Sequence, residues 1–159
     1  MTPFPTRAKV TGKQAHIMII IDTRVCEVME RDPAVVRKDE TVTQVAESMA
    51  KFDLRVIVVK DGDKVVGILT DHDIVARCVA ESKPLSTPVH SIMSSSIAPV
   101  HPDMHIMEAL DIMHKREIHR LAVVEHIDKK QVLVGIITEG DIKRRIFTDI
   151  SELLKKAAI

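Results

Sequence analysis

An eight-residue pattern occurs twice in the chain and constrains its fold more than any other feature. Residues 67–74 read Gly-Ile-Leu-Thr-Asp-His-Asp-Ile, and residues 135–142 read Gly-Ile-Ile-Thr-Glu-Gly-Asp-Ile, 68 positions later (135 − 67). In both copies the aliphatic residues predict the end of a strand, and a threonine followed three positions later by an aspartate predicts the start of a helix. A chain that repeats this junction is expected to contain two related units.

The polar residues of the pattern suit a sugar phosphate. The hydroxyl of Thr70 or Thr138 and the free amides of a helix N-terminus can donate hydrogen bonds to phosphate oxygens. The carboxylate of Asp73 or Asp141 can accept hydrogen bonds from the two hydroxyls of a ribose. The alternative is an ordinary helix cap, because threonine and aspartate also cap helices that bind nothing.

Charge and aromatic content restrict the partners. The chain has 159 residues, of which 45% are hydrophobic, and its 23 basic residues are balanced by 23 acidic ones, so we expect a globular protein without the positive field that holds nucleic acid. It contains no Trp, no Tyr and only three Phe, and therefore lacks aromatic platforms for stacking bases. Nucleic acid is thus an unlikely partner, and any bound base is expected to lie between aliphatic side chains.

The remaining signals indicate a cytoplasmic protein without a metal or a catalytic centre. Cys26 and Cys78 are too few for a disulfide framework or a zinc site, and the longest apolar run, residues 17–21, is too short for a membrane span. Six histidines crowd the second half, but none has a partner at metal-ligand spacing. No nucleophile motif and no phosphate-binding Gly-rich loop is present. We therefore expect no metal, no cofactor, no membrane contact and no enzymatic activity.

The order of patterns divides the chain into an N-terminal extension, two repeats, a linker and a tail. We expect the extension at residues 1–24, the first repeat at 25–81 and the linker at 82–88. The second repeat is expected at 89–147 and the tail at 148–159. The apolar run at 17–21 predicts either a buried strand or a patch covered by a partner chain. The tail is expected to continue the last helix and to pack on the body or on a second subunit, because Ile150, Leu153 and Leu154 recur at helical spacing.

Each repeat predicts the order lead turn, strand, helix, strand, strand, helix. Thr41 and Gln44 form a capping box ahead of a helix with one apolar face. The two repeats match at an offset of 64, since Met93 corresponds to Met29 (93 − 29), and the offset reaches 68 at Gly135. We assign one of the additional residues to a position just before Arg120, taken as the counterpart of Arg55, and the others to a longer turn around residues 128–130. The fold class is α/β (α+β), with two pseudo-two-fold-related β-α-β-β-α repeats packed through their sheets and two clefts between them.

The ordered pattern resembles the tandem cystathionine β-synthase (CBS) domain family, whose paired domains are called a Bateman module. The resemblance covers about residues 25–147. It rests on Met29 and Met93 at the ends of the lead turns, on the strand Ile-His-Arg-Leu-Ala-Val-Val at residues 118–124, and on the two Gly-aliphatic-aliphatic-Thr-x-x-Asp motifs.

The resemblance implies ligand sites in both clefts. In this family the aspartate holds an adenosine ribose, the neighbouring threonine holds ribose or phosphate, and the base lies against aliphatic residues of the other repeat. One site would then contain Thr70, Asp73, Ile97, Ala98 and Val100, and the other would contain Thr138, Asp141, Pro33, Ala34 and Val36. Phosphates would meet Arg55 in one repeat and His119 with Arg120 in the other. Unequal affinities are expected because the motifs differ at His72 and Gly140.

Two functions remain open at this point. One is a regulatory sensor that binds AMP, ADP, ATP or a related adenosyl ligand and acts on a regulated protein. The other is a structural or oligomerising CBS pair without a physiological nucleotide. In either case we expect a homodimer, because the apolar run at 17–21 and the apolar tail need cover.

Overall fold

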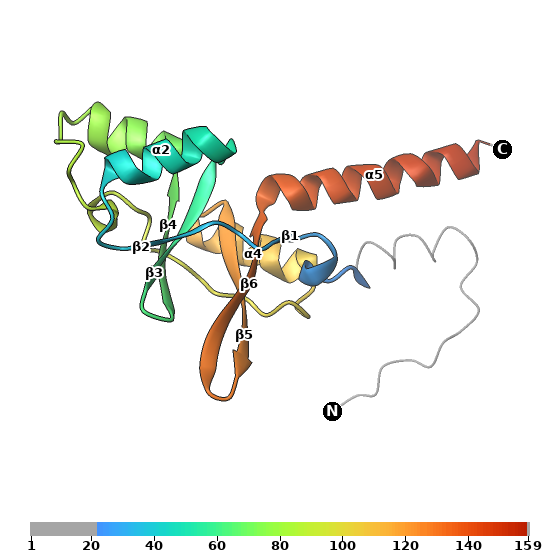
Figure 1. The fold of residues 1–159 in the computed structure, drawn as a ribbon. Coiled ribbons are helices and arrows are strands. Elements are labelled where there is room, and N and C mark those ends of the chain that lie inside the picture. Colours follow the sequence, from blue (N-terminus) through green and yellow to red (C-terminus); the bar gives the residue numbers. More distant parts are fainter. Residues whose placement is uncertain (1–21, 159) are drawn as a thin grey trace.

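The protein consists of two small sheets, each flanked by helices, as seen in a computed structural model that describes residues 22–158 (Figure 1). The apolar run at 17–21 lies outside the described residues. The first half contains β2 (Val35–Arg37), α2 (Val42–Phe52), β3 (Val56–Asp61), β4 (Lys64–Thr70), α3 (Asp71–Ile74) and the π-helical turn η2 (Val75–Val79). The second half contains α4 (Ile106–Arg116), β5 (Arg120–Ile127), β6 (Lys130–Thr138) and α5 (Glu139–Ala157). The short turns η1 (Val25–Glu27) and η3 (Val89–Ser91) and the strand β1 (Glu30–Arg31) lead into the repeats.

The two sheets have related topologies. In the first, β2 pairs parallel with β3 and β3 pairs antiparallel with β4; in the second, the strand order is β1-β6-β5 and all pairs are antiparallel. The first strand of the second repeat is reduced to one parallel bridge, between Val100 and Val123. The predicted mixed α/β class with a repeated strand–helix–strand–strand–helix order is confirmed, apart from this shortened strand.

Local sequence explains where the helices begin and end. The Thr41 hydroxyl accepts a hydrogen bond from the Gln44 amide at 3.3 Å, and the Gln44 side chain accepts one from the Thr41 amide at 2.9 Å, which confirms the predicted capping box. The helices α2 and α4 both end at an acidic residue in the left-handed region, Asp53 (φ 52°) and Glu117 (φ 54°). These equivalent ends turn the chain into β3 and β5.

The lead segment of each repeat packs in the other half. Val25 and Met29 belong to the core formed with α4, β5 and β6, whereas Val89 and Ile92 belong to the core formed with α2, β3 and β4. Backbone hydrogen bonds follow the same exchange, from Val25 N to Met104 O (2.8 Å) and from Val42 N to Thr87 O (2.9 Å). Each half therefore completes its core with a segment from the other repeat.

The exchanged segments explain why a glycine in the last strand and a methionine in the lead segment occur in both repeats. A Cβ atom on Gly67 would collide with the Met93 sulfur, and one on Gly135 would lie 2.6 Å from the Met29 sulfur. Ser94, next to Met93, bonds to Ile68 on β4 through both backbone groups, while β1, next to Met29, pairs with β6. Only a residue without a side chain lets the two crossing segments, residues 28–33 and 92–97, approach these strands.

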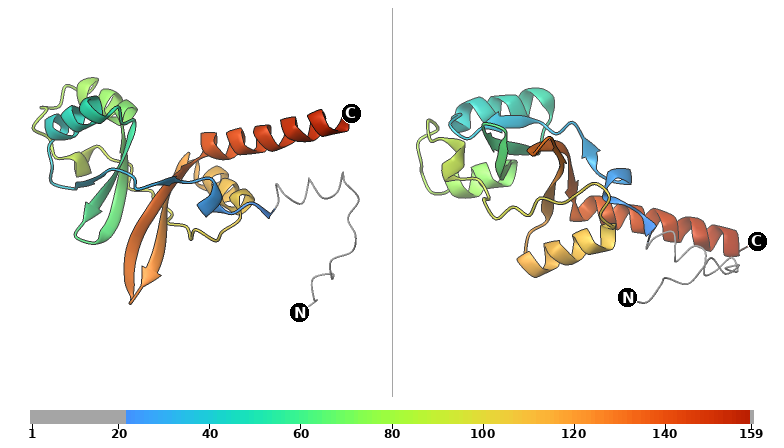
Figure 2. Two further views of the ribbon diagram at one scale, coloured as in Figure 1. Left: turned by 45° about the vertical axis from the view of Figure 1, so that its right-hand side comes forward. Right: turned by 90° about the horizontal axis from the view of Figure 1, so that it is seen from below.

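The two sheets, drawn as the green and orange strands in Figure 2, are joined by a third apolar cluster. Val58, Val65 and Ile68 from the first half pack there with Ala122, Val124 and Ile136 from the second. The predicted packing of the repeats through their sheets is confirmed.

The extra residues of the second repeat lie within the hairpin, and the predicted insertion before Arg120 is wrong. Arg120 pairs with Thr138 as Val56 pairs with Thr70, so Arg120 is the counterpart of Val56 and His119 is the counterpart of Arg55 (119 − 55 = 64). The predicted longer turn is also wrong. Both hairpins have two-residue turns, at 62–63 and at 128–129, and β5 and β6 are each two residues longer than β3 and β4. The four additional residues lengthen the paired strands, because this leaves no backbone group unpaired.

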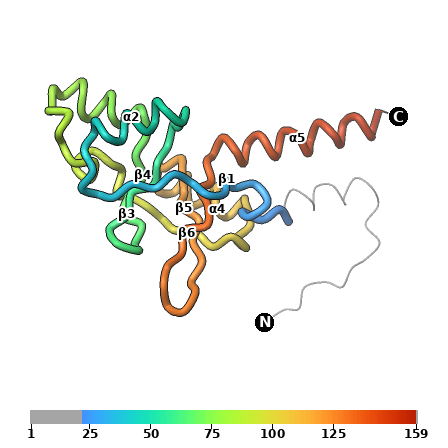
Figure 3. The backbone as a smooth tube through the Cα atoms, viewed as in Figure 1, coloured from blue at the N-terminus to red at the C-terminus, as the bar shows by residue number. Residues whose placement is uncertain are grey.

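The last helix continues through the tail, as predicted, and extends away from the body (Figure 3). Ile142 is its one fully buried side chain within the described residues. Farther along, Phe147 and Leu154 are 71% and 66% exposed. Much of the apolar side of α5 is therefore left exposed by the described part of the chain.

Candidate ligand-binding site

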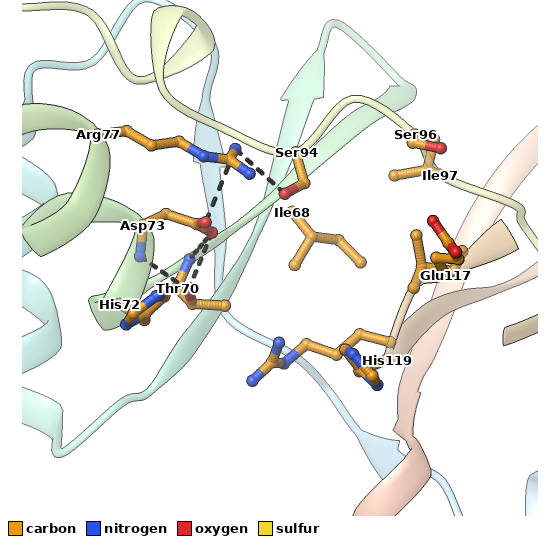
Figure 4. A pocket seen from close by; sticks show the side chains of 12 residues that line it. Ile68, Thr70, His72, Asp73, Arg77, Ser94, Ser96, Ile97, Glu117 and His119 are labelled. Carbon is orange, nitrogen blue, oxygen red and sulfur yellow. Dashed lines mark hydrogen bonds and ion pairs between the residues drawn. The ribbon is translucent and has the colours of Figure 1, made fainter. Parts of the chain in front are cut away.

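A cavity of about 350 Å³ lies between the two halves, at the start of α3 (Figure 4). One wall comes from β4, α3 and η2, and a second from residues 94–97 of the crossing segment. The third wall comes from the end of α4 and the start of β5. The lining residues are Ile68, Thr70, His72, Asp73, Arg77, Ser94, Ser96, Ile97, Glu117, Ile118, His119 and Arg120.

Thr70 and Asp73 form a reciprocal helix cap at the floor of this cavity. Oδ2 of Asp73 accepts hydrogen bonds from the amide and the hydroxyl of Thr70, both at 2.9 Å, and the Asp73 amide donates to the Thr70 hydroxyl at 3.1 Å. The two residues are only 5% and 8% exposed. The cap accounts for Oδ2 but leaves Oδ1 of Asp73 available as an acceptor, so capping and ligand binding are compatible in one residue.

Arg77 connects this cap to the crossing segment. Its Nη1 donates to the carbonyl of Ile92 at 3.0 Å and to the hydroxyl of Ser94 at 3.3 Å, and it lies 3.7 Å from Oδ1 of Asp73. In Figure 4 these side chains occupy one side of the cavity, while Glu117 and His119 lie opposite.

The opposite wall combines apolar surface with cations. Ile97 and Ile118 face the cavity together with Ile68, which supplies aliphatic surface for a flat base, and Arg120 adds a guanidinium group. Nδ1 of His119 lies 2.6 Å from Oε2 of Glu139, and Lys143 pairs with the other carboxylate oxygen at 2.5 Å. The hydrogen bonds from Lys143 and His119 lower the pKa of Glu139 to about 2. Glu139 therefore orients the His119 ring at the rim of the cavity.

The second motif repeats the cap but lies at a shallower groove of about 250 Å³. Oδ2 of Asp141 accepts from the Thr138 amide at 3.0 Å and from its hydroxyl at 2.7 Å, as in the first copy. The other oxygen of Asp141 is 3.4 Å from Nη1 of Arg144. The groove is lined by Glu27, Val28, Asp141, Arg144, Arg145 and Thr148.

The structure brings together only part of the predicted site residues. Five of them line the cavity: Thr70, Asp73, Ile97, His119 and Arg120. Ala98 and Val100 do not line the cavity and are buried in the core of the second half. Of the second set, Asp141 alone lines the groove; Thr138 caps α5, Val36 is buried in the first core, Pro33 and Ala34 are half-buried, and Arg55 is exposed.

Several lining residues were not among the sequence predictions, notably Arg77, Ser94 and Ser96. Arg77 carried a signal, because Arg145 follows it at the same offset of 68 (145 − 77) that relates the two threonines and the two aspartates. The serines carried none, since their counterparts 64 positions earlier are Glu30 and Asp32.

Two kinds of feature are absent from the described part of the chain. Within residues 22–158, no three His, Cys, Asp or Glu side chains are grouped so that they could hold a metal ion. No helix in the same range is long and apolar enough to cross a membrane.

Known proteins are similar to this chain in sequence and in fold. The family model described as CBS domain matches residues 25–80 and 89–148. The CBS domain-containing protein YhcV of Bacillus subtilis is 30% identical over 116 residues, which is 73% of this chain and 80% of that protein. Hypoxic response protein 1 of Mycobacterium tuberculosis is 30% identical over 122 residues, which is 76% of this chain and 82% of its own length.

A solved structure shows what a similar pair of domains binds. The CBS domain pair of protein MJ0100, crystallised in complex with 5′-methylthioadenosine and S-adenosyl-L-methionine, superposes with a TM-score of 0.68 at 25% identity, covering 79% of this chain and 97% of that one. The fold, the duplicated motif and the matched residues lead to one assignment: this chain belongs to the CBS domain family and carries two CBS domains.

Proposed function

We propose that this protein is a non-catalytic regulatory module that binds an adenine nucleotide, or a related adenosyl ligand, in the cavity at Asp73. The observation that carries the proposal is Oδ1 of the nearly buried Asp73, which the helix cap leaves without a hydrogen bond, in a cavity with aliphatic walls and cationic groups. A ribose hydroxyl would donate to Oδ1 of Asp73, the base would lie among Ile68, Ile97 and Ile118, and phosphate would meet His119 and Arg120.

The size of the cavity and the relatives support this assignment. A volume of about 350 Å³ lies within the range of roughly 300–1,000 Å³ that is usual for small-molecule sites. The MJ0100 domain pair binds two adenosyl compounds. Ala98 and Val100 would support the base from behind, and Thr138, Asp141, Pro33, Ala34, Val36 and Arg55 would form at most a weaker second site. Cys26 and Cys78 are both free thiols, which is consistent with a cytoplasmic location, because the cytoplasm keeps thiols reduced.

The assembly we propose is a homodimer that reports nucleotide occupancy to a regulated protein. Exposed apolar side chains on α5 (Phe147, Ile150 and Leu154) favour a second copy as cover, and among similar structures are hexameric CBS-CP12 proteins. A structural CBS pair without a nucleotide is the second candidate, because these same side chains could form a subunit interface without any bound ligand. Sedimentation that shows only monomer at micromolar concentration would contradict the dimer in both cases.

The function is tested by thermal shift and calorimetry with adenosine, AMP, ADP, ATP, S-adenosylmethionine and, as a control for the base, CMP. A ligand at a hundred times its dissociation constant is expected to stabilise the folded state by about 2.7 kcal/mol. We expect a shift with at least one adenine compound and none with CMP. If all six compounds leave the melting temperature unchanged at millimolar concentration, the structural candidate is favoured.

A further inference from the structure

Arg77 is placed to respond to what occupies the cavity. Its Nη1 serves three acceptors from two segments, namely Asp73 on its own helix and both Ile92 and Ser94 on the crossing segment. Among the described residues, its Nε and Nη2 have no hydrogen-bond or ion-pair partner. The side chain is 44% exposed and lines the cavity, so these unused donors can reach a ligand.

Asp73 can offer a ligand only the oxygen that Arg77 also contacts. Oδ2 already accepts two hydrogen bonds from Thr70 at 2.9 Å, whereas Oδ1 has the Arg77 guanidinium at 3.7 Å. A ribose hydroxyl on Oδ1 therefore competes with Arg77. An uncharged nucleoside would weaken this ion pair and supply no anion in exchange, whereas a nucleotide would supply a phosphate.

We propose, building on the proposed function, that Arg77 is the residue that makes the cavity prefer phosphorylated over unphosphorylated adenosine. The ribose takes Oδ1 of Asp73, and the phosphate lies between the unused donors of Arg77 on one side and His119 with Arg120 on the other. The guanidinium fork suits this role, because it can present two parallel N–H groups to a phosphate while Nη1 keeps its bond to the Ile92 carbonyl.

The second groove lacks this arrangement although it has the corresponding arginine. Nε of Arg145 lies 3.1 Å from both carboxylate oxygens of Asp149, and its Nη2 is 4.0 Å from Glu27. Within the described part of the chain, Arg145 makes no hydrogen bond or ion pair with Asp141, which pairs with Arg144 instead. Arg145 is therefore a matched control: it is equivalent to Arg77 in sequence, but it contacts the carboxylates of Asp149 and Glu27.

The test is calorimetry of adenosine and AMP with the wild type, Arg77→Gln, Arg77→Lys and Arg145→Gln. We expect Arg77→Gln to weaken AMP binding roughly tenfold, the effect of one partly exposed charge-assisted hydrogen bond, and to leave adenosine unchanged or bound more tightly. The preference for AMP should then fall by at least tenfold. Arg77→Lys should retain part of the preference, since it keeps the charge but loses the fork, and Arg145→Gln should keep all of it.

Two outcomes would overturn the role of Arg77 while leaving the proposed function intact. One is an equal loss for adenosine and AMP in Arg77→Gln, which would indicate a purely structural contact with Ile92 and Ser94. The other is unchanged affinity for both ligands. A wild type that binds neither adenosine nor AMP would refute the selectivity of Arg77, whereas the proposed function fails only if ADP, ATP and S-adenosylmethionine are not bound either.

Discussion

The cavity at Asp73 and the groove at Asp141 share one cap geometry but have different surroundings. In both, the aspartate accepts from the amide and the hydroxyl of a threonine three positions earlier. At the cavity the crossing segment contributes Ser94 and Ser96, whereas their counterparts in sequence, Glu30 and Asp32, are not among the residues that line the groove. Duplicating the motif has thus preserved the helix start, while the neighbouring segment decides whether a deep cavity forms above it.

The largest expected effect is on nucleotide affinity when the cavity aspartate is removed. Asp73→Ala should weaken AMP binding by about ten- to a hundredfold, because a hydrogen bond to a charged group is lost. Asp141→Ala should change the affinity of the cavity by less than about twofold, since it lies at the other groove. Both variants should also lose about 0.5–2 kcal/mol of stability as cap residues. Calorimetry and melting of the two variants separate the roles, and an equal loss of stability without any loss of affinity would reduce Asp73 to a cap.

Stability should respond unequally at the two glycines under the crossing segments. A Cβ on Gly135 would lie 2.8 Å from the Glu30 carbonyl oxygen, whereas one on Gly67 would lie 3.0 Å from the Ser94 carbonyl oxygen, and both would also meet a methionine side chain. Because a backbone atom yields less than a side chain, Gly135→Ala should cost more than Gly67→Ala, each within about 1–3 kcal/mol.

The control for this pair is Gly140→Ala in the first turn of α5. Its Cβ would meet nothing closer than the Thr138 hydroxyl at 3.6 Å, so we expect it to be neutral or to stabilise by up to about 1 kcal/mol. Chemical denaturation measures all three variants. Equal costs for Gly67→Ala and Gly135→Ala would show that the methionines, and not the crossing backbone, set the tolerance.

A smaller effect is expected when the groove is made to resemble the cavity. In an Asp73→Ala background, Glu30→Ser with Asp32→Asn should raise AMP affinity at the groove by about two- to fivefold, because two exposed negative charges are removed. Asparagine is chosen at residue 32 because that position is left-handed (φ 53°), which asparagine tolerates. Calorimetry measures the gain; unchanged affinity would mean that depth, rather than charge, separates the two sites.

The smallest effect concerns acid stability and distinguishes Glu139 from the remaining carboxylates. Hydrogen bonds from Lys143 and His119 lower the folded-state pKa of Glu139 from 4.5 to about 2. The deprotonated form is thereby favoured in the folded state, so its contribution is present above about pH 4.5 and is lost as the pH falls toward 2. The stability difference between the wild type and Glu139→Gln should accordingly shrink across this window in urea titrations. A difference that stays constant from pH 5 to pH 3 would contradict this origin of the shift.

The sequence predicted those features that depend on nearby residues. The capping boxes at Thr41, Thr70 and Thr138 involve partners three positions away, and the alternation of strand and helix follows from local periodicity. For the cavity, five of the lining residues were predicted, because the motif and its partner strand mark them.

The remaining features depend on pairing between distant segments, which residue types do not reveal. Matching Arg120 to Arg55 by residue type placed an insertion before β5, whereas the backbone register matches His119 to Arg55 and leaves all four extra residues in the hairpin. Of the second predicted set, Asp141 alone lines the groove, for a related reason. Pro33, Ala34 and Val36 follow the crossing strand β1, and their final position depends on where that strand pairs.

The exchange of lead segments also bears on how the chain folds while it is being synthesised. The first half contains β2, α2, β3 and β4, yet its core stays incomplete until Val89 and Ile92 have left the ribosome. The second half has the opposite order, because Val25 and Met29 are made long before the helix and strands that bury them. Neither half can finish folding as an independent unit during translation, so a nascent chain stalled before residue 89 should remain sensitive to protease, whereas one released after α5 should be resistant.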